Sequence, residues 1–364
     1  MNRAKSKEDI QDESSMQTRI RIKDIAQQIG VSTATVSNVI HGKTQKISQR
    51  TVEKVQQTLE ESGYIPNMAA VLLAQNSSKI VCVVLSDDVK YQSQMLKDPF
   101  VAALLNGLSK YLNEYGYFLM LKEEREVEKI AQYASMWNMA GLILIGYCEM
   151  DYDSLRSKMR IPFLVIDGYS KETKRYSDIG IDNEDGGYQA GNYLISKGHT
   201  KVMFLSDNDL SGDHERYMGM KRAFTQAGIP MEEGHFKLLP MDKKERSAYF
   251  QKLIKETDRF SAAFCASDVY AIEFMNHCLD EGILIPEEFS VMGFDDIPMA
   301  EYVRPRLTTI RQDIDKRAEM AVRMLDELIM HRARAWKEIL PVSLVERESV
   351  KQIKVNKEAY RKPG

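Results

Sequence analysis

Four polar residues stand where expected strands end or an expected helix begins, and their side chains suit the recognition of a hydroxyl-rich ligand. Three of them directly follow apolar runs and the fourth opens a helical pattern: Asp167, Ser267, Asp295 and Arg216. Carboxylates and guanidinium groups bind neighbouring hydroxyls through paired, charge-assisted hydrogen bonds. Such a site disfavours analogues that lack a hydroxyl, because a buried polar group is then left unpaired. Isolated aspartates at strand ends also cap helices or lie in loops, so this alternative stays open for each of them.

Catalytic and metal-binding patterns are not found beside these residues. No Gly-x-Gly-x-x-Gly pattern follows the apolar runs 80–85 or 202–206, and neither a phosphate-binding Gly-x-x-x-x-Gly-Lys loop nor a Gly-x-Ser-x-Gly elbow occurs. His199 lies in a Gly-His turn and His214 lies beside Asp213, and neither has a partner at metal-ligand spacing. We expect surface or capping roles for both histidines. The sequence therefore predicts no enzyme, no cofactor and no metal site.

The composition is that of a water-soluble protein with more than one domain. A chain of 364 residues with 43% hydrophobic and 28% charged residues is long enough for two or three domains. No apolar run approaches the roughly 18 residues that span a membrane, and the first residues contain no signal-peptide core. Four widely spaced cysteines lie in or beside apolar runs and predict reduced core residues: Cys82, Cys148, Cys265 and Cys278. We expect a cytoplasmic protein without a membrane partner.

Alternating strands and helices position the four polar residues. From residue 79 onward, short apolar runs predict strands at 80–85, 117–121, 141–145 and 163–166, and in a second series at 202–206, 236–239, 262–266 and 290–294. Amphipathic patterns predict helices at 100–115, 127–137, 187–197, 215–227, 246–257 and 269–281. This alternation indicates an α/β fold with parallel sheets covered by helices. Two series predict two lobes, with a ligand crevice at the carboxyl ends of the strands, where Phe100 could add an apolar wall.

The segment 22–41 predicts two short helices joined by a tight turn. Gly30 ends the first helix, and Ser32 can cap the amino end of the second. Apolar residues at helical spacing give each helix one inner face: Ile22, Ile25, Ala26 and Ile29, then Val36, Val39 and Ile40. The outer face of the second helix is small or polar and contains no acid: Thr33, Ala34, Ser37, Asn38 and His41. Such a helix fits the major groove of DNA, although an ordinary helical hairpin has the same spacing.

Basic residues gather around this segment although the whole chain has a formal net charge of −3. The acids nearby are Asp24 and Glu53. The basic residues outnumber them and are Arg19, Arg21, Lys23, Lys43, Lys46, Arg50 and Lys54. A local basic surface is what contact with the phosphates of DNA requires. A charged cluster can equally be a solvated surface, so it supports the motif and does not establish it.

The order of residues here and along the remaining chain resembles the lactose-repressor (LacI/GalR) family of transcription factors. The first segment reads I-x-D-I-A, then G-V-S-x-x-T-V-S-x-V, followed by the helical pattern 48–62 and G-Y-I-P-N. Further matches are D-P-F at 98–100, D-N at 182–183 with G-G at 186–187, G-H at 198–199, R-x-x-G at 216–219, G-F-D-D at 293–296, L-T-T-I at 307–310 and L-V-E-R-E-S at 344–349. The resemblance covers residues 20 to 350.

The resemblance implies a domain plan with a DNA-binding part and a ligand-binding part. It implies a three-helix helix-turn-helix domain at 19–65, a hinge helix and linker at 66–78, and a bilobal body like periplasmic binding proteins at 79–350. The chain would cross between lobes near 181, 310 and 340. Residues 1–18 read as a disordered extension, and 351–364 as a polar tail without the leucine heptads of a tetramer-forming helix.

The resemblance also assigns roles to single residues. In the family, a leucine of the hinge helix wedges into the minor groove; Leu73 falls on that position, and we assign Ala70 to the same contact. The second helix would read bases through Thr33, Ala34 and Asn38, while Ser32, Ser37 and Lys43 hold phosphates. The effector positions of the family fall on Phe100, Asp167, Arg216, Ser267 and Asp295.

Three departures from the family pattern affect these assignments. Asn38 stands where many relatives carry arginine, and asparagine prefers adenine where arginine prefers guanine. Val71 stands where the hinge often has an arginine, and Ser267 where many relatives have asparagine. We therefore expect altered operator bases, fewer charged hinge contacts and an effector that the family pattern does not name.

The family implies a homodimeric repressor whose affinity for operator DNA is controlled by a small-molecule effector, with a carbohydrate expected. Two alternatives stay open. The main regulator could be a protein corepressor, as in catabolite-control relatives, or the body could act as a sugar-binding module whose DNA-binding part matters little. Whether the effector is an inducer or a corepressor stays open as well.

Overall fold

The computed structural model describes residues 20–65, 78–86, 95–147, 154–155, 157–168, 177–232, 234–332 and 334–353. The chain divides into two compact units, Met1–Asn76 and Ser77–Gly364, which we describe one at a time. Several predicted features lie outside the described residues. They are the extension at 1–18, nearly all of the hinge helix and linker at 66–78 with Ala70 and Leu73, Cys148, and residues 354–364 of the tail.

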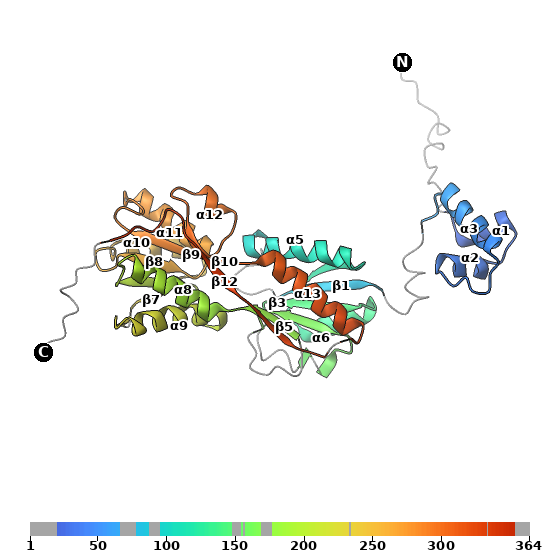
Figure 1. The fold of residues 1–364 in the computed structure, drawn as a ribbon, viewed down its shortest axis with the longest axis horizontal. Coiled ribbons are helices and arrows are strands. Elements are labelled where there is room, and N and C mark those ends of the chain that lie inside the picture. Colours follow the sequence, from blue (N-terminus) through green and yellow to red (C-terminus); the bar gives the residue numbers. More distant parts are fainter. Residues whose placement is uncertain are drawn as a thin grey trace, which may run out of the picture. The chain divides into compact units, whose positions relative to one another are not determined.

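The described residues of the first unit, 20–65, form three helices, drawn in blue in Figure 1: α1 (Ile22–Ile29), α2 (Thr33–Ile40) and α3 (Gln49–Glu61). Gly30 ends α1 with a φ of 73°, and the Ser32 side chain accepts a hydrogen bond from the Thr35 amide of α2 at 3.0 Å. The predicted inner faces form one small core, whose buried members are Ile25, Ala26, Ile29, Val36, Val39, Val52 and Val55. The three-helix prediction for this unit is confirmed.

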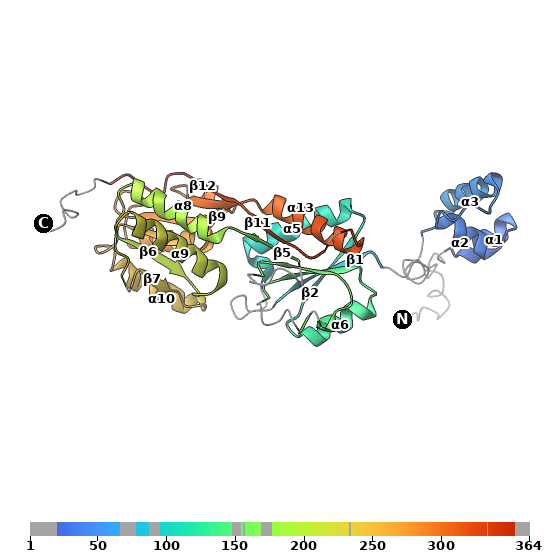
Figure 2. The same ribbon diagram turned by 60° about the horizontal axis from the view of Figure 1, so that its bottom comes forward.

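The second unit contains two lobes, each built on a six-stranded sheet. The first lobe consists of β1 (Ile80–Leu85), the 3-10 helix η1 (Met95–Lys97), α5 (Pro99–Glu114), β2 (Phe118–Glu123), α6 (Val127–Met136), β3 (Gly141–Ile145), β4 (Phe163–Ile166), β5 (Ser177–Ile181), α13 (Ile314–Ile329) and β11 (Lys337–Leu340). Its strand order is β11-β5-β4-β3-β1-β2, and all neighbours are parallel. Helices α5 and α13 lie side by side on one face of this sheet, and α6 lies on the other (Figure 2).

The second lobe repeats this plan. It consists of α8 (Asn183–Ser196), β6 (Val202–Ser206), α9 (Ser211–Gln226), β7 (Phe236–Leu238), α10 (Lys243–Ile254), β8 (Ala262–Cys265), α11 (Asp268–Asp280), β9 (Ser290–Asp295), α12 (Met299–Tyr302), β10 (Thr308–Gln312) and β12 (Val342–Val345). Its strand order is β12-β10-β9-β8-β6-β7. Only the pair β10 and β12 is antiparallel among the described strands. The α/β fold with two parallel-sheet lobes is confirmed.

The chain passes between the lobes three times. It leaves the first lobe after β5, returns after β10, and crosses again between β11 and β12. The strands β11 and β12 lie on either side of the last crossing, and Figure 2 shows β11 in the first lobe and β12 in the second. Each lobe therefore contains segments from distant parts of the sequence.

Several elements lie outside the predicted pattern. No strand was predicted at β5, β10, β11 or β12, and no helix at α13. The predicted helices exist, but most begin earlier because acidic or hydroxyl side chains cap them. The Asp182 side chain accepts a hydrogen bond from the Asp185 amide at 2.9 Å, so α8 begins at Asn183 and not at the predicted residue 187.

Candidate ligand site between the two lobes

A cavity of about 350 Å³ lies where the carboxyl ends of the strands of the two lobes face each other. All five residues that the sequence analysis selected line this one cavity: Phe100, Asp167, Arg216, Ser267 and Asp295. The remaining lining residues are Lys97, Asp98, Pro99, Asp207, Asp213, Met241, Arg246, Ala266, Val269, Tyr270, Ile297, Gln312 and Arg317. Its size falls at the small end of the range for ligand pockets, about 300–1,000 Å³. The structure therefore brings together the five predicted residues, although the outermost two, Phe100 and Asp295, are 195 positions apart in the sequence.

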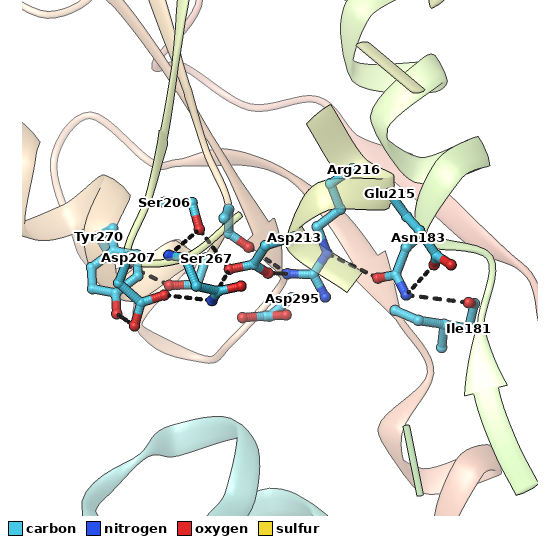
Figure 3. Close-up of polar contacts among 12 residues, drawn as sticks. Ile181, Asn183, Ser206, Asp207, Asp213, Glu215, Arg216, Ser267, Tyr270 and Asp295 are labelled. Atoms are coloured by element: carbon cyan, nitrogen blue, oxygen red, sulfur yellow. Dashed lines mark hydrogen bonds and ion pairs between the residues drawn. The ribbon is translucent and has the colours of Figure 1, made fainter. Parts of the chain in front are cut away.

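Three hydrogen bonds and a ring contact hold the guanidinium group of Arg216 in place. Its Nε donates to Asn183 Oδ1 at 2.9 Å, and its Nη1 donates to the Ala266 carbonyl at 2.5 Å and to Asp213 Oδ1 at 3.3 Å. The group also stacks on the ring of Phe294, 3.7 Å from the centroid. Figure 3 shows Arg216 between Asp213 and Asn183, with Asp295 below it. A fixed guanidinium of this kind is prearranged to bind a ligand oxygen.

Close contact between α8 and α9 explains the position of Arg216. A Cβ atom added at Gly187 would lie 1.9 Å from the Arg216 carbonyl oxygen, and one added at Gly219 would lie 1.9 Å from the Glu184 carbonyl oxygen. The two glycines therefore let the helix backbones touch, as the adjacent α8 and α9 in Figure 1 illustrate. This contact gives the predicted Gly-Gly and Arg-x-x-Gly motifs a physical reason.

Asp295 ends β9 and turns into the cavity wall with a φ of 115°. Gln312 Nε2 donates to its Oδ1 at 2.7 Å, and the residue is 8% exposed. Burial raises the pKa of the Asp295 carboxyl, while the positive charge of Arg216 opposes this shift. Asp268 beside it is fully buried, and burial also raises its pKa. Because burial raises its pKa, the Asp295 carboxyl can be protonated more readily than a free aspartate, and a protonated carboxyl can donate as well as accept hydrogen bonds.

Ser267 and Asp167 have partners of their own. The Ser267 hydroxyl accepts from the Tyr270 amide at 3.5 Å as the cap of α11, the alternative role considered above for residues at strand ends. Asp167 has a φ of 60° and forms an ion pair with Arg317. Both residues still line the cavity, and Phe100 lies half-buried in the first turn of α5.

Sequence reasoning missed further polar residues in the cavity wall. Tyr270 Oη donates to Asp207 Oδ2 at 2.6 Å, and Arg246 pairs with Glu273 at 2.7 Å. Asp207 directly follows a predicted strand, so the rule that selected Asp167 and Asp295 would have found it. The other missed residues, Gln312 and Arg317, belong to elements that were not predicted.

Six of the residues predicted to contact DNA lie on α2 or directly beside it, and the other two, Ala70 and Leu73, lie outside the described residues. Ser32, Thr33, Ala34, Asn38 and Lys43 are exposed, and Ser37 is half-buried. The core of the unit holds the opposite side of α2 through Val36 and Val39. The outer face of the helix is therefore free of core contacts and presents small, polar side chains.

His199 is not the surface or capping residue that we predicted. It is fully buried, with Nδ1 2.9 Å from Ser261 Oγ and Nε2 3.1 Å from the Lys351 carbonyl oxygen. The reason is the chain after β12, which passes over the turn before β6 and covers the ring. His214 is half-exposed and contacts Asp209 at 2.8 Å, as a surface residue would.

The described part of the chain holds no group of three or more His, Cys, Asp or Glu side chains suited to a metal ion. Within the same residues, no helix is both long and apolar enough to cross a membrane.

Comparisons with known proteins agree with both units. Residues 21–67 match the family described as bacterial regulatory proteins of the lacI family, and residues 192–350 match a periplasmic binding protein-like domain. The chain is 30% identical to the HTH-type transcriptional regulator MalR of Clostridium butyricum and 32% identical to the HTH-type transcriptional repressor PurR of Vibrio atlanticus. Each match covers 91% of this chain and 99% of the relative.

Solved structures show the same fold. The lac repressor dimer bound to operator and the anti-inducer ONPF superposes with a TM-score of 0.78 at 24% identity, over 91% of this chain and 99% of the other. The complex of the regulator CelR with cellobiose gives 0.68 at 24%, over 91% and 100%. A LacI-family regulator from Enterococcus faecium with bound ribose gives 0.64 at 25%, over 75% and 100%. The chain belongs to the lacI family of bacterial regulatory proteins, which bind DNA and regulate transcription.

Proposed function

We propose that this protein is a homodimeric, cytoplasmic repressor whose affinity for its operator is set by a small sugar bound in the cavity between its lobes. One observation carries the proposal: five residues selected for ligand recognition, far apart in the sequence, line a single cavity. The cavity combines a fixed guanidinium group with buried carboxyl groups, which is the chemistry that hydroxyl-rich ligands need.

The choice of a sugar rests on the wall of the cavity and on two relatives. Arg216 and Asp295 place a donor group and a carboxyl group at the same wall, where adjacent hydroxyls can bridge them. Phe100 offers an apolar surface for the carbon skeleton of a sugar ring. The solved CelR and Enterococcus faecium proteins contain cellobiose and ribose, respectively. A neutral mono- or disaccharide is therefore the ligand class we propose.

Ligand binding acts through the relative arrangement of the lobes. Phe100 and Asp167 belong to the first lobe, and Arg216, Ser267 and Asp295 to the second. A ligand that contacts both walls binds one arrangement of the lobes more tightly and shifts the population towards it. In the proposed mechanism this shift changes the spacing of the two hinge segments of the dimer, and hence its affinity for DNA.

Base recognition is proposed for the exposed face of α2. Thr33, Ala34 and Asn38 would face base edges in the major groove, and Ser32, Ser37 and Lys43 would hold phosphates. Ala70 and Leu73 would contact the minor groove. The exposure of the α2 side chains and their isolation from the core support this assignment.

The ligand is identified by thermal unfolding of the purified full-length protein with neutral mono- and disaccharides. A ligand that binds the folded state raises the midpoint of unfolding as its concentration rises. We expect at least one sugar to do so for the natural sequence, and Asp295→Ala to lose that shift. If no sugar stabilises the protein while a protein partner does, the corepressor alternative replaces this proposal.

A further inference from the structure

Arg317 is a cavity residue that the proposed function has not used. It lies in the first turn of α13 in the first lobe, lines the cavity, and is only 1% exposed. It therefore places a guanidinium group on the wall formed by the first lobe, whereas Arg216 and Arg246, which also line the cavity, belong to the second lobe. A buried arginine needs several partners, because its group carries five N–H donors.

Two of these donors have partners in the structure. Nη2 pairs with Asp167 Oδ1, and Nη1 donates to Gln312 Oε1 at 2.8 Å. Gln312 in turn donates to Asp295 at 2.7 Å. These contacts connect Asp167 of the first lobe, through Arg317 and Gln312, to Asp295 of the second lobe, the carboxyl group that we assign to the ligand.

The Nε of Arg317 is buried and has no hydrogen-bond acceptor among the described residues. Buried donors in folded proteins are nearly always paired. The guanidinium group lies 5.6 Å from the centroid of the Phe100 ring, which also lines the cavity. An oxygen atom of a ligand placed against Phe100 is the acceptor that this arrangement lacks.

The charges around Arg317 favour a neutral acceptor. The Asp167 carboxylate already compensates the guanidinium group. Asp178, which is 3% exposed, adds a second carboxyl group on the same side; burial raises its pKa, while the charges of Lys337 and Arg317 oppose this shift. An anionic ligand group here would meet Asp167 at short range, whereas a hydroxyl or ring oxygen would not be repelled.

We propose that Arg317 is a specificity-determining residue that donates to a hydroxyl or ring oxygen of a neutral sugar, and that its pairing with Asp167 excludes sugar acids from the cavity. This inference rests on the proposed function, since it names the class of ligand for the same site. It gives Asp167 a second role, as the charge partner that sets the selectivity of Arg317.

Isothermal titration calorimetry of the full-length protein tests this inference with two kinds of probe. The probes are neutral sugars (glucose, ribose, maltose and cellobiose) and one acidic counterpart, glucuronate. For the neutral sugar that binds, we expect Arg317→Met to weaken binding at least tenfold. We expect Asp167→Asn to raise the affinity for glucuronate relative to the neutral sugar at least tenfold, because Arg317 then loses its compensating charge.

A double variant guards against misfolding. Arg317→Met alone leaves Asp167 without its partner. The double variant Arg317→Met/Asp167→Asn removes both charges and is measured beside it. We expect the double variant to lose binding of the neutral sugar without gaining binding of glucuronate. If both Arg317 variants bind the neutral sugar as tightly as the natural sequence does, this inference is overturned while the proposed function stands. Tighter binding of glucuronate than of neutral sugars by the natural sequence also overturns it. If no sugar binds the natural sequence, the proposed function fails, and this inference fails with it.

Discussion

Arg216 shows how a single side chain can serve both the fold and the ligand site. Its guanidinium group joins α8, α9 and the end of β8 through Asn183, Asp213 and the Ala266 carbonyl. Lysine has one ammonium group and cannot reproduce this planar set of contacts or the stacking on Phe294. The site thus depends on the shape of the guanidinium group as well as on its charge.

We therefore predict that Arg216→Lys weakens ligand binding at least tenfold and lowers the free energy of unfolding by about 1–3 kcal/mol. Calorimetric titration and urea unfolding measure the two effects. Arg222→Lys is the matched control, since Arg222 lies on the same helix, pairs with Glu184 at 2.6 Å and stacks on Tyr188, but its side chain is 43% exposed. Equal losses in the two variants would contradict the role given to Arg216.

His199 makes stability depend on pH. Burial lowers its pKa from 6.5 to about 4, so the folded protein keeps the ring neutral over a range in which the unfolded chain binds a proton. The stabilising contribution is complete above pH 6.5 and is lost as the pH falls from 6.5 towards 4. One pKa unit corresponds to about 1.4 kcal/mol, so the loss is at most a few kcal/mol.

Urea unfolding at pH 7 and pH 4.5 checks this expectation. His199→Gln should show a smaller fall in the free energy of unfolding between the two pH values than the natural sequence. The half-exposed His214 supplies the control, and His214→Gln should retain the fall. An unchanged pH dependence in His199→Gln would show that the buried ring is not its source.

The residues of the site were predictable to different degrees. Asp295 and Arg216 stand beside strong local patterns, so their positions at the cavity follow from parallel strands ending at one edge. Arg317 carries no such signal, because its place in the cavity depends on the chain returning to the first lobe after β10. The burial of His199 likewise depends on the chain after β12, which a local pattern does not reveal.

At the scale of elements, the contact between α8 and α9 positions the proposed ligand site. Gly187 and Gly219 each face a backbone oxygen of the other helix at a distance that leaves no room for a Cβ atom. An alanine there must push the helices apart, and Arg216 moves with α9. The spacing of this helix pair is therefore a condition for the geometry of the cavity.

Gly187→Ala should lower the free energy of unfolding by about 1–3 kcal/mol or more and weaken ligand binding, although residue 187 does not line the cavity. Thermal unfolding and calorimetric titration provide the two readings. Asn192→Ala, an exposed change on the same helix, should leave both close to the natural values. Full ligand affinity in Gly187→Ala would mean that helix spacing does not control the site.

We propose that helix α2 is the element whose sequence sets the operator. Asn38 is exposed on its outer face, and asparagine makes paired hydrogen bonds with adenine. We predict that selection of binding sites from random DNA returns adenine at the base pair that Asn38 contacts, and that Asn38→Ala loses this preference at a cost of about 1–3 kcal/mol. Selection of guanine by both proteins would contradict the assignment.

Most elements with clear apolar periodicity were predictable from the sequence. The runs at β1, β3, β4 and β6 agree in both bounds with the structure, because their residues are buried on both sides of a sheet. Strand β5 reads Ser-Asp-Ile-Gly-Ile, and only its position between β4 and β11 makes it a strand. Helix α13 also has apolar residues at helical spacing on its buried face, Ala318, Ala321, Val322 and Leu325, and the prediction missed it.

At the scale of the whole molecule, three chain crossings join the lobes while leaving a cavity between them. Short connections of this kind let two rigid lobes change their relative arrangement without unfolding. A ligand that contacts residues of both lobes can therefore select one arrangement. The central claim is that this selection is transmitted to the affinity of the protein for DNA.

The most direct test is a titration of labelled operator DNA with the purified full-length protein, followed by fluorescence anisotropy, with and without the sugar that stabilises it. We predict that the sugar changes the operator Kd by at least fivefold, a coupling of about 1 kcal/mol or more. Asp295→Ala should bind the operator as the natural sequence does, but with the same Kd in both conditions. An operator Kd that the bound sugar leaves unchanged in the natural protein would contradict the account.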